Sequence, residues 1–142
     1  MKIGLRVCVN TLQGALQGVP NLLRLFDTYK VRASFFFALG PDRCGRFTSA
    51  HALQPWCKQR DFASRLGATL LPAPMIARRA ADQMRSAKDA GHEIGLLSFD
   101  PVHWVHKAAH ADAAWTRREL TESIDVFGRV FGEPPRCHAA AG

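Results

Sequence analysis

Apolar and polar residues alternate along the first stretch of the chain, residues 1–11. The apolar positions are Ile3, Leu5, Val7 and Val9, and the polar positions are Arg6, Cys8 and Asn10. A period of two predicts a β-strand with one apolar and one polar face. The strand leads into a turn at residues 11–14, which is typical of α/β folds, whose chemistry lies at the carboxyl ends of the strands.

Helical and strand-like patterns alternate through the rest of the chain. They predict helices at 19–29, 78–90 and 115–131 and strands at 31–39, 92–98 and 136–141. Pro20 suits the first turn of a helix, and Gly91 and Gly132 suit helix ends. Thr116 and Glu119 have the spacing of a capping box. This order of elements predicts an α/β fold with parallel strands joined by helices.

Two stretches depart from this alternation. Residues 41–74 contain repeated proline and glycine, which predicts an irregular insertion with short helices around 51–65. The apolar side chains of this insertion either pack beneath the rim of the fold or contact a lipid. Residues 98–112 predict a loop that holds three of the six histidines.

Composition narrows the class of protein. The 142 residues are 47% apolar and 22% charged, which predicts one globular domain over residues 1–142. The sequence contains no run long enough for a membrane span and no signal-peptide pattern, so we expect a cytoplasmic location with reduced cysteines. The net charge of +7 is spread along the chain without an aromatic-basic motif, so nucleic acid is not an expected partner.

Three segments carry a resemblance to a known family. They are GLRVCVNTLQGALQGVPNLLRLFDTYKVRASFFFALGPD, AGHEIGLLSFD and PPRCHAAAG. These segments resemble the first βα unit and the second, third and fourth strands of the NodB-type polysaccharide deacetylases. The most similar subfamily deformylates a lipid-linked formamido-arabinose in lipid A modification. The resemblance implies a partial (β/α) barrel with parallel strands and with helices on its outer face.

The family is one of carbon–nitrogen hydrolases that use a divalent metal such as zinc to remove an N-formyl or N-acetyl group from a sugar. The resemblance places the family's catalytic base at Cys8 and its metal-binding carboxylate at Asn10. The two metal-binding histidines correspond to Leu97 and Pro101, which have no donor atom for a metal. We call these four the inherited positions. No bound cofactor and no hydrolysis are therefore expected, and the chain is expected to be a pseudoenzyme.

The predicted fourth strand supplies two further candidates. Arg136 and His138 lie two residues apart, so both share one face of that strand and could point toward the inherited positions. The resembled family continues beyond the position that corresponds to Gly142, which implies a truncated barrel. We expect its inner face and free edges to favour self-association. The competing expectation is that residues 41–74 fold over that face.

A relocated metal site is the alternative to loss of catalysis. His103, His106 and His110 would lie on one helical face if their segment were helical, and three imidazoles can hold a catalytic zinc. Two functions therefore follow from the sequence. One is a non-catalytic domain that binds a lipid-linked amino sugar or the cytoplasmic membrane face, peripheral to the inner membrane. The other is a hydrolase with relocated zinc ligands.

Overall fold

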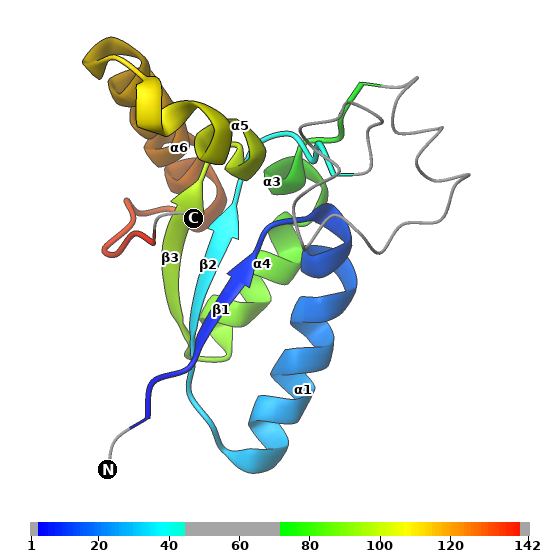
Figure 1. Ribbon diagram of the computed structural model, residues 1–142. Helices are drawn as coiled ribbons and strands as arrows, with labels where there is room; N and C mark the ends of the chain where they lie inside the picture. Colours follow the sequence, from blue (N-terminus) through cyan, green and yellow to red (C-terminus); the bar gives the residue numbers. More distant parts are fainter. Residues whose placement is uncertain (1–2, 45–71, 140–142) are drawn as a thin grey trace.

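A computed structural model of the chain describes residues 3–44 and 72–139 (Figure 1). Its centre is a sheet of parallel strands in the order β1-β2-β3. The strands are β1 (Arg6–Val9), β2 (Ser34–Ala38) and β3 (Glu93–Ser98). This confirms the predicted parallel α/β architecture, and the sheet is open over the described ranges. The short helices expected around 51–65 lie outside those ranges.

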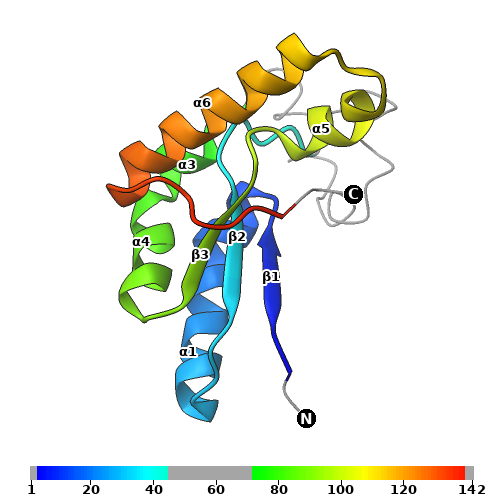
Figure 2. The ribbon, with the colours of Figure 1, turned by 90° about the vertical axis from the view of Figure 1, so that its left-hand side faces the viewer.

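Helices occupy the connections between the strands. They are η1 (Gly14–Gly18), α1 (Val19–Tyr29), α3 (Ile76–Arg79), α4 (Ala81–Asp89), α5 (Pro101–Lys107), η3 (Ala108–His110) and α6 (Ala113–Phe131). Figure 2 shows α1, α4 and α6 on one side of the sheet. The first predicted helix agrees with α1 at both ends. Over residues 3–44 and 72–139, no helix is long and apolar enough to cross a membrane.

The core lies between the sheet and these helices. Phe35 and Phe37 of β2 are fully buried, and their rings stack at 6.1 Å. Phe26 of α1 contacts the edge of Phe35 at 6.0 Å, and Phe131 of α6 lies 6.1 Å from Phe37. Aromatic rings in such edge and offset arrangements stabilise the core beyond their burial alone. The near-continuous apolar run at 31–39 predicts a strand buried on both faces, and the face that packs against the helices agrees with this.

The face of the sheet that points away from these helices was expected to be an exposed apolar surface, but its apolar side chains are buried. Phe36 is 8% exposed and Leu97 is 1% exposed. A side chain at Gly95 would collide with the ring of Phe36 and with the sulfur of Cys137, so only glycine fits there. Exposed apolar side chains instead precede β1, where Ile3 is 75% and Leu5 is 42% exposed. Self-association of the chain stays a prediction.

The segment predicted as one helix at 78–90 consists of two helices, α3 and α4. The backbone leaves helical geometry at Ala80, and the break lets α3 dock at the end of β2. The Ile76 and Ala77 amides donate to the carbonyls of Gly40 and Leu39 at 2.9 and 3.1 Å. Hydrogen bonds to the end of β2 therefore fix where α3 begins, and the local sequence pattern does not indicate this start. The predicted end at Gly91 is confirmed, since this residue has a positive φ of 78°.

Three other predictions need correction. Residues 98–112 are not a loop, because Asp100 caps the amides of Val102 and His103 and α5 begins directly afterwards. The cap of α6 is Asp112, whose carboxylate accepts a hydrogen bond from the Trp115 amide at 2.7 Å, and not Thr116. The fourth strand is reduced to one parallel bridge between Leu96 and His138 among the described residues.

Cysteine chemistry also departs from expectation. Cys8 and Cys137 are free thiols. Cys44 is bonded in a disulfide, whereas all four cysteines were expected to be reduced. Cys44 is buried at 2% exposure and lies six residues after the end of β2 at Ala38. The spacing of the cysteines along the sequence gave no sign of this bond.

Candidate functional site

The carboxyl ends of the three strands meet at one edge of the sheet, and the side chains that follow them form the candidate site (Figure 1). Asn10 follows β1, Asp42 lies beyond β2, and Asp100 follows β3. Asp42 and Asp100 are 3% and 2% exposed. Two buried carboxylates at the ends of neighbouring parallel strands mark this edge as the polar centre of the molecule.

The inherited positions are distributed along this edge. Cys8 is paired with Phe36 in the register of the sheet and is exposed. Asn10 is half-buried at the end of β1. Leu97 is fully buried in β3, and Pro101 is the buried first residue of α5. Asn10 can offer one neutral amide oxygen, whereas Leu97 and Pro101 carry only hydrocarbon, so this set of side chains does not fit a zinc ion.

Cys8 and Asn10 also line a small cavity of about 180 Å³ beside β1. Its other walls come from the loop after the strand and from the start of α1, among them Val7, Val9, Thr11, Gly14, Gly18, Val19 and Leu22. The Thr11 hydroxyl accepts a hydrogen bond from the Gly14 amide at 2.9 Å, which holds the turn closed. Two of the inherited positions therefore line one cavity.

Asp42 connects the loops that follow β1 and β2. One carboxylate oxygen accepts a hydrogen bond from the Leu12 amide at 2.9 Å, and the other accepts one from the Cys44 amide at 2.9 Å. Leu12 and Asp42 are 30 positions apart in the chain. A charged acceptor that receives two backbone donors is a strong positioning element. Asp42 therefore holds the loop after β1 next to the loop after β2.

Asp100 has the same role on the other side of the site. One of its oxygens accepts hydrogen bonds from the amides of Val102 and His103 at 3.1 and 3.0 Å, which caps α5. Its other oxygen pairs with Nε of Arg43. The carboxylate of Asp100 is thus compensated by one cation and two helix amides.

Glu119 of α6 adds a third carboxyl group near this pair. Its Oε2 is buried and has no hydrogen-bond partner within the described ranges, and the same holds for the hydroxyl of Ser98. Burial raises the pKa of the Glu119 carboxyl above its ordinary value, and the charge of Asp100 adds to this effect. Lys107 and Arg43 act in the opposite direction. Glu119 therefore takes up a proton more readily than a solvated glutamate.

Aromatic side chains close the site beside α5. Trp104 lies 5.9 Å from Trp115 and 6.3 Å from the ring of His138. The ammonium of Lys107 lies 5.6 Å from the centre of the Trp115 ring, a distance suited to a cation–π contact. His138 is thus brought to the Trp104 side of the sheet edge, while its backbone pairs with Leu96 of β3.

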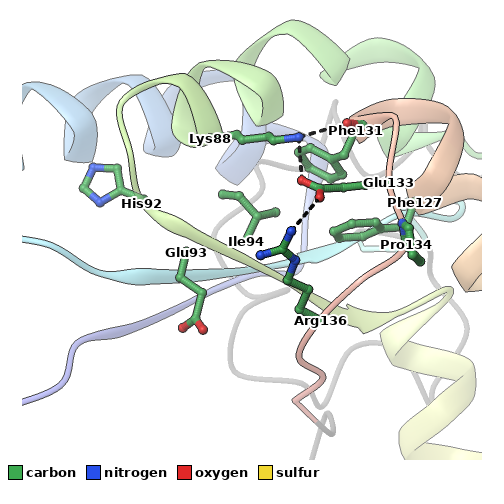
Figure 3. A pocket seen from close by; sticks show the side chains of 9 residues that line it. All are labelled: Lys88, His92, Glu93, Ile94, Phe127, Phe131, Glu133, Pro134 and Arg136. Carbon is green, nitrogen blue, oxygen red and sulfur yellow. Dashed lines mark hydrogen bonds and ion pairs between the residues drawn. The ribbon is translucent and has the colours of Figure 1, made fainter.

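Arg136 is engaged elsewhere. It lines a cavity of about 270 Å³ together with residues of β3, α4 and the end of α6, and none of the inherited positions lines that cavity (Figure 3). Glu133 joins Lys88 at 2.6 Å and Arg136 at 3.3 Å, and its pKa is lowered chiefly by the hydrogen bond from Lys88. Lys88 also donates to the carbonyl of Phe131 at 3.0 Å, so this network anchors the end of α6.

The three candidate zinc ligands do not converge. His103 and His106 lie on α5, His110 lies on η3, and all three residues are exposed. Over residues 3–44 and 72–139, no three His, Cys, Asp or Glu side chains lie together in a group that could hold a metal ion. The helix continues only to Lys107, so the spacing that would align three histidines on one α-helical face is interrupted.

Sequence reasoning missed the residues that dominate the polar centre: Asp42, Arg43, Ser98, Asp100 and Glu119. Asp100 could have been found, because an aspartate followed directly by proline is a typical helix start. Asp42 and Glu119 act across long sequence separations, for which local patterns contain no signal.

Comparisons with known proteins show which family the chain resembles. No family model matches the sequence. Over 99% of its length, the chain is 34% identical to a protein of Shewanella sediminis (strain HAW-EB3) that is named as the 4-deoxy-4-formamido-L-arabinose-phosphoundecaprenol deformylase ArnD. The chain spans about half the length of the curated relatives it matches, 49% and 48%.

Solved structures with the same fold are more distant in sequence. A polysaccharide deacetylase from Mycobacterium smegmatis has a TM-score of 0.58 and 22% identity, with 95% of this chain and 41% of that one covered. A CE4 family pseudoenzyme from Bacillus anthracis has a TM-score of 0.60 and 14% identity, with coverage of 97% and 34%. The chain is therefore a homologue of the ArnD-type deformylases and shares the fold of the matched part of the polysaccharide deacetylases.

Proposed function

We propose that this chain is a polysaccharide deacetylase-like domain that has lost hydrolysis and still binds a lipid-linked amino sugar. The observation that carries the proposal is the pair Leu97 and Pro101, because neither side chain can coordinate a metal. The inherited reaction would need a metal-bound water and a base to attack the carbonyl carbon of an N-formyl or N-acetyl group. Neither partner of that step is supplied by the inherited positions.

The base position supports the same conclusion. A thiol at Cys8 accepts a proton only as thiolate, and its ordinary pKa of about 8.5 leaves it mostly protonated at neutral pH. Asn10 offers an amide that cannot act as a base. Hydrolysis would therefore need both a new metal site and a new base.

Binding is supported by what the site retains. Cys8 and Asn10 line a cavity, and hydrogen bonds from the Leu12 and Cys44 amides to Asp42 join the neighbouring loops after β1 and β2. The curated relatives are named for a sugar attached to phosphoundecaprenol, so the proposed ligand belongs to that class. A cytoplasmic location peripheral to the inner membrane is part of this proposal. It implies that the bond of Cys44 is reduced in the cell, since disulfides are rare in that compartment.

The test of lost hydrolysis is a turnover assay of the purified chain with a formamido sugar and with an acetamido sugar. We expect no release of formate or acetate above the buffer rate when zinc, cobalt or manganese is offered, and no metal retained after gel filtration. Turnover that a chelator abolishes would contradict the proposal.

Self-association is a second, separate expectation. No described element pairs with the outer edge of β1, and the exposed side chains of Ile3 and Leu5 precede that strand. Such an edge favours pairing with a second copy of the chain. We expect sedimentation to show a dimer that Leu5→Lys shifts toward monomer, because a charge on the edge disfavours strand pairing. A concentration-independent monomer would show that the edge is protected.

A further inference from the structure

One backbone amide directly before β2 donates to a side chain instead of to a carbonyl. The amide of Ala33 donates to Nδ1 of His92 at 3.3 Å, across 59 positions of the chain. The carbonyl of Ala33 accepts a hydrogen bond from the amide of Glu93 at 3.1 Å. On the other side of β2, the amide of Ser34 donates to the carbonyl of Leu5 at 2.9 Å. The imidazole nitrogen of His92 therefore takes the place of a backbone acceptor where β2 and β3 first meet.

The imidazole of His92 is enclosed by the core. His92 is 9% exposed and Ala33 is 6% exposed. The centre of the imidazole lies 5.2 Å from the ring of Phe35 and 5.7 Å from the ring of Phe26, and both contacts are edge-on. The backbone amide of His92 donates to the carbonyl of Ala87 in α4 at 3.2 Å. This single residue therefore connects α1, β2, α4 and the start of β3.

This arrangement suits the neutral imidazole and not the imidazolium. In the neutral ring Nδ1 is an acceptor when Nε2 carries the proton, whereas both nitrogens of the imidazolium are donors. Protonation would therefore set two N–H groups, those of Ala33 and of Nδ1, against each other at a buried position. Burial lowers the pKa of His92 below its ordinary value of 6.5, and the guanidinium of Arg32 adds to this effect. His92 thus stabilises the folded chain fully above pH 6.5, and this contribution is lost as the pH falls toward the lower folded-state pKa.

The charged groups around His92 are already engaged. Arg32 has the same charge as an imidazolium and donates to the carbonyl of Gly91, the residue before His92. The carboxylate of Glu93 accepts a hydrogen bond from the hydroxyl of Ser34 on the neighbouring strand. An imidazolium at His92 would gain a carboxylate partner only by breaking such a pair. The other charged residues that line a cavity with His92 pair with one another, and they are Lys88, Glu133 and Arg136 (Figure 3).

We propose that His92 is an acid-sensitive latch that joins the amino ends of β2 and β3. Uptake of a proton by its imidazole removes the hydrogen bond from the Ala33 amide, so the two strand ends separate and the contact with Phe26 of α1 loosens. The candidate site lies at the carboxyl ends of these strands, away from His92, and keeps its structure (Figure 1). The inference does not depend on the proposed loss of hydrolysis or on sugar binding.

Hydrogen exchange of the full chain, with rates corrected for the intrinsic effect of pH, tests the latch. We expect the protection of the Ala33 amide to fall about tenfold between about pH 8 and about pH 5.5, which is the loss that one buried hydrogen bond implies. The Ser34 amide is the internal control, because it donates to Leu5 and should keep its protection. An equal loss at both amides would mean that the whole sheet opens, and no loss at Ala33 would mean that the latch stays closed. Either result overturns the inference.

Two variants assign the proton to His92. His92→Asn keeps an acceptor oxygen close to the place of Nδ1 that does not titrate, so the protection of Ala33 should be the same at both pH values. His92→Phe keeps a ring between Phe26 and Phe35 without an acceptor, and Ala33 should be weakly protected at both pH values. His103→Gln is the matched control, an exposed histidine on α5 whose loss should leave the pH dependence of the parent chain intact. A pH dependence that persists in either variant of His92, or that disappears in His103→Gln, would assign the proton to another group and overturn the inference.

Discussion

Two sets of residues lie at the carboxyl edge of the sheet, and they differ in the chemical groups that their side chains offer. Among the inherited positions, Leu97 and Pro101 offer no donor atom for a metal, and Asn10 offers only a neutral amide oxygen. Asp42 and Asp100, at the same edge, are buried and hold the loops after β1 and β3 through backbone hydrogen bonds. The contrast shows that the shape of this edge does not depend on metal ligation, because its loops are held by carboxylates and backbone amides.

Restoring the metal ligands at the inherited positions should produce the largest measurable change, a gain in zinc affinity. The variant with Cys8→Asp, Asn10→Asp, Leu97→His and Pro101→His is expected to bind one zinc ion with a dissociation constant of about 1 μM or lower, equivalent to about 8 kcal/mol. The retained loops would hold the new side chains near their inherited places. Calorimetric titration with zinc measures this.

The control for that variant leaves the histidines out. Cys8→Asp and Asn10→Asp together supply carboxylates without imidazoles, and we expect no stoichiometric zinc binding. Equal affinity in both variants would mean that zinc binds elsewhere on the chain and that the retained loops do not organise the inherited positions.

Removal of Asp100 should give the next largest effect. Asp100→Ala removes the cap of α5 and leaves Arg43 without its buried partner, so the free energy of unfolding should fall by about 3 kcal/mol. Urea denaturation monitored by circular dichroism measures the change. Asp27→Ala is the matched control, because Asp27 pairs with Lys30 on the surface and its loss should not be measurable. If the two variants unfold alike, Asp100 does not support this edge.

The smallest effect concerns the protonation of Glu119. Because its pKa is raised in the folded chain, Glu119 contributes to stability below the ordinary value of 4.5, and this contribution is lost as the pH rises through the folded-state pKa. Glu119→Gln cannot ionise. Its free energy of unfolding should therefore exceed that of the parent chain increasingly above pH 4.5, by less than about 1 kcal/mol after solvent screening. Thermal unfolding of both chains over a pH series checks the sign.

The elements that sequence reasoning located well are those with strong local periodicity. The helix at 19–29 has a proline at its start and an apolar stripe, and it agrees with α1 at both ends. The phenylalanine-rich strand and the strand after Gly91 are also where they were expected. An element with a buried face has apolar residues at regular positions along its sequence. The element can therefore be located without knowing which other elements it packs against.

The errors share one physical cause. The break at Ala80 and the reduced fourth strand depend on what the segment packs against. Asp42 and Glu119 matter because of residues far away in the sequence, such as Leu12 and Asp100. The inherited positions, in contrast, are assigned only through the resemblance of the flanking segments, and this assignment stays a prediction. Their proposed loss of function rests on side-chain chemistry.

The parallel arrangement of the sheet has a consequence for how quickly the chain can fold. Each strand pairing must close a long loop: the amide of Ala33 meets the side chain of His92 across 59 positions, and Leu12 meets Asp42 across 30. No hairpin can nucleate the described strands, because all of their pairings are parallel. Closure of such loops costs entropy before any ladder bond forms, so α1 and α6 can gain structure early while the sheet assembles last. Until that step, the phenylalanines of β2 remain open to other chains in the crowded cell.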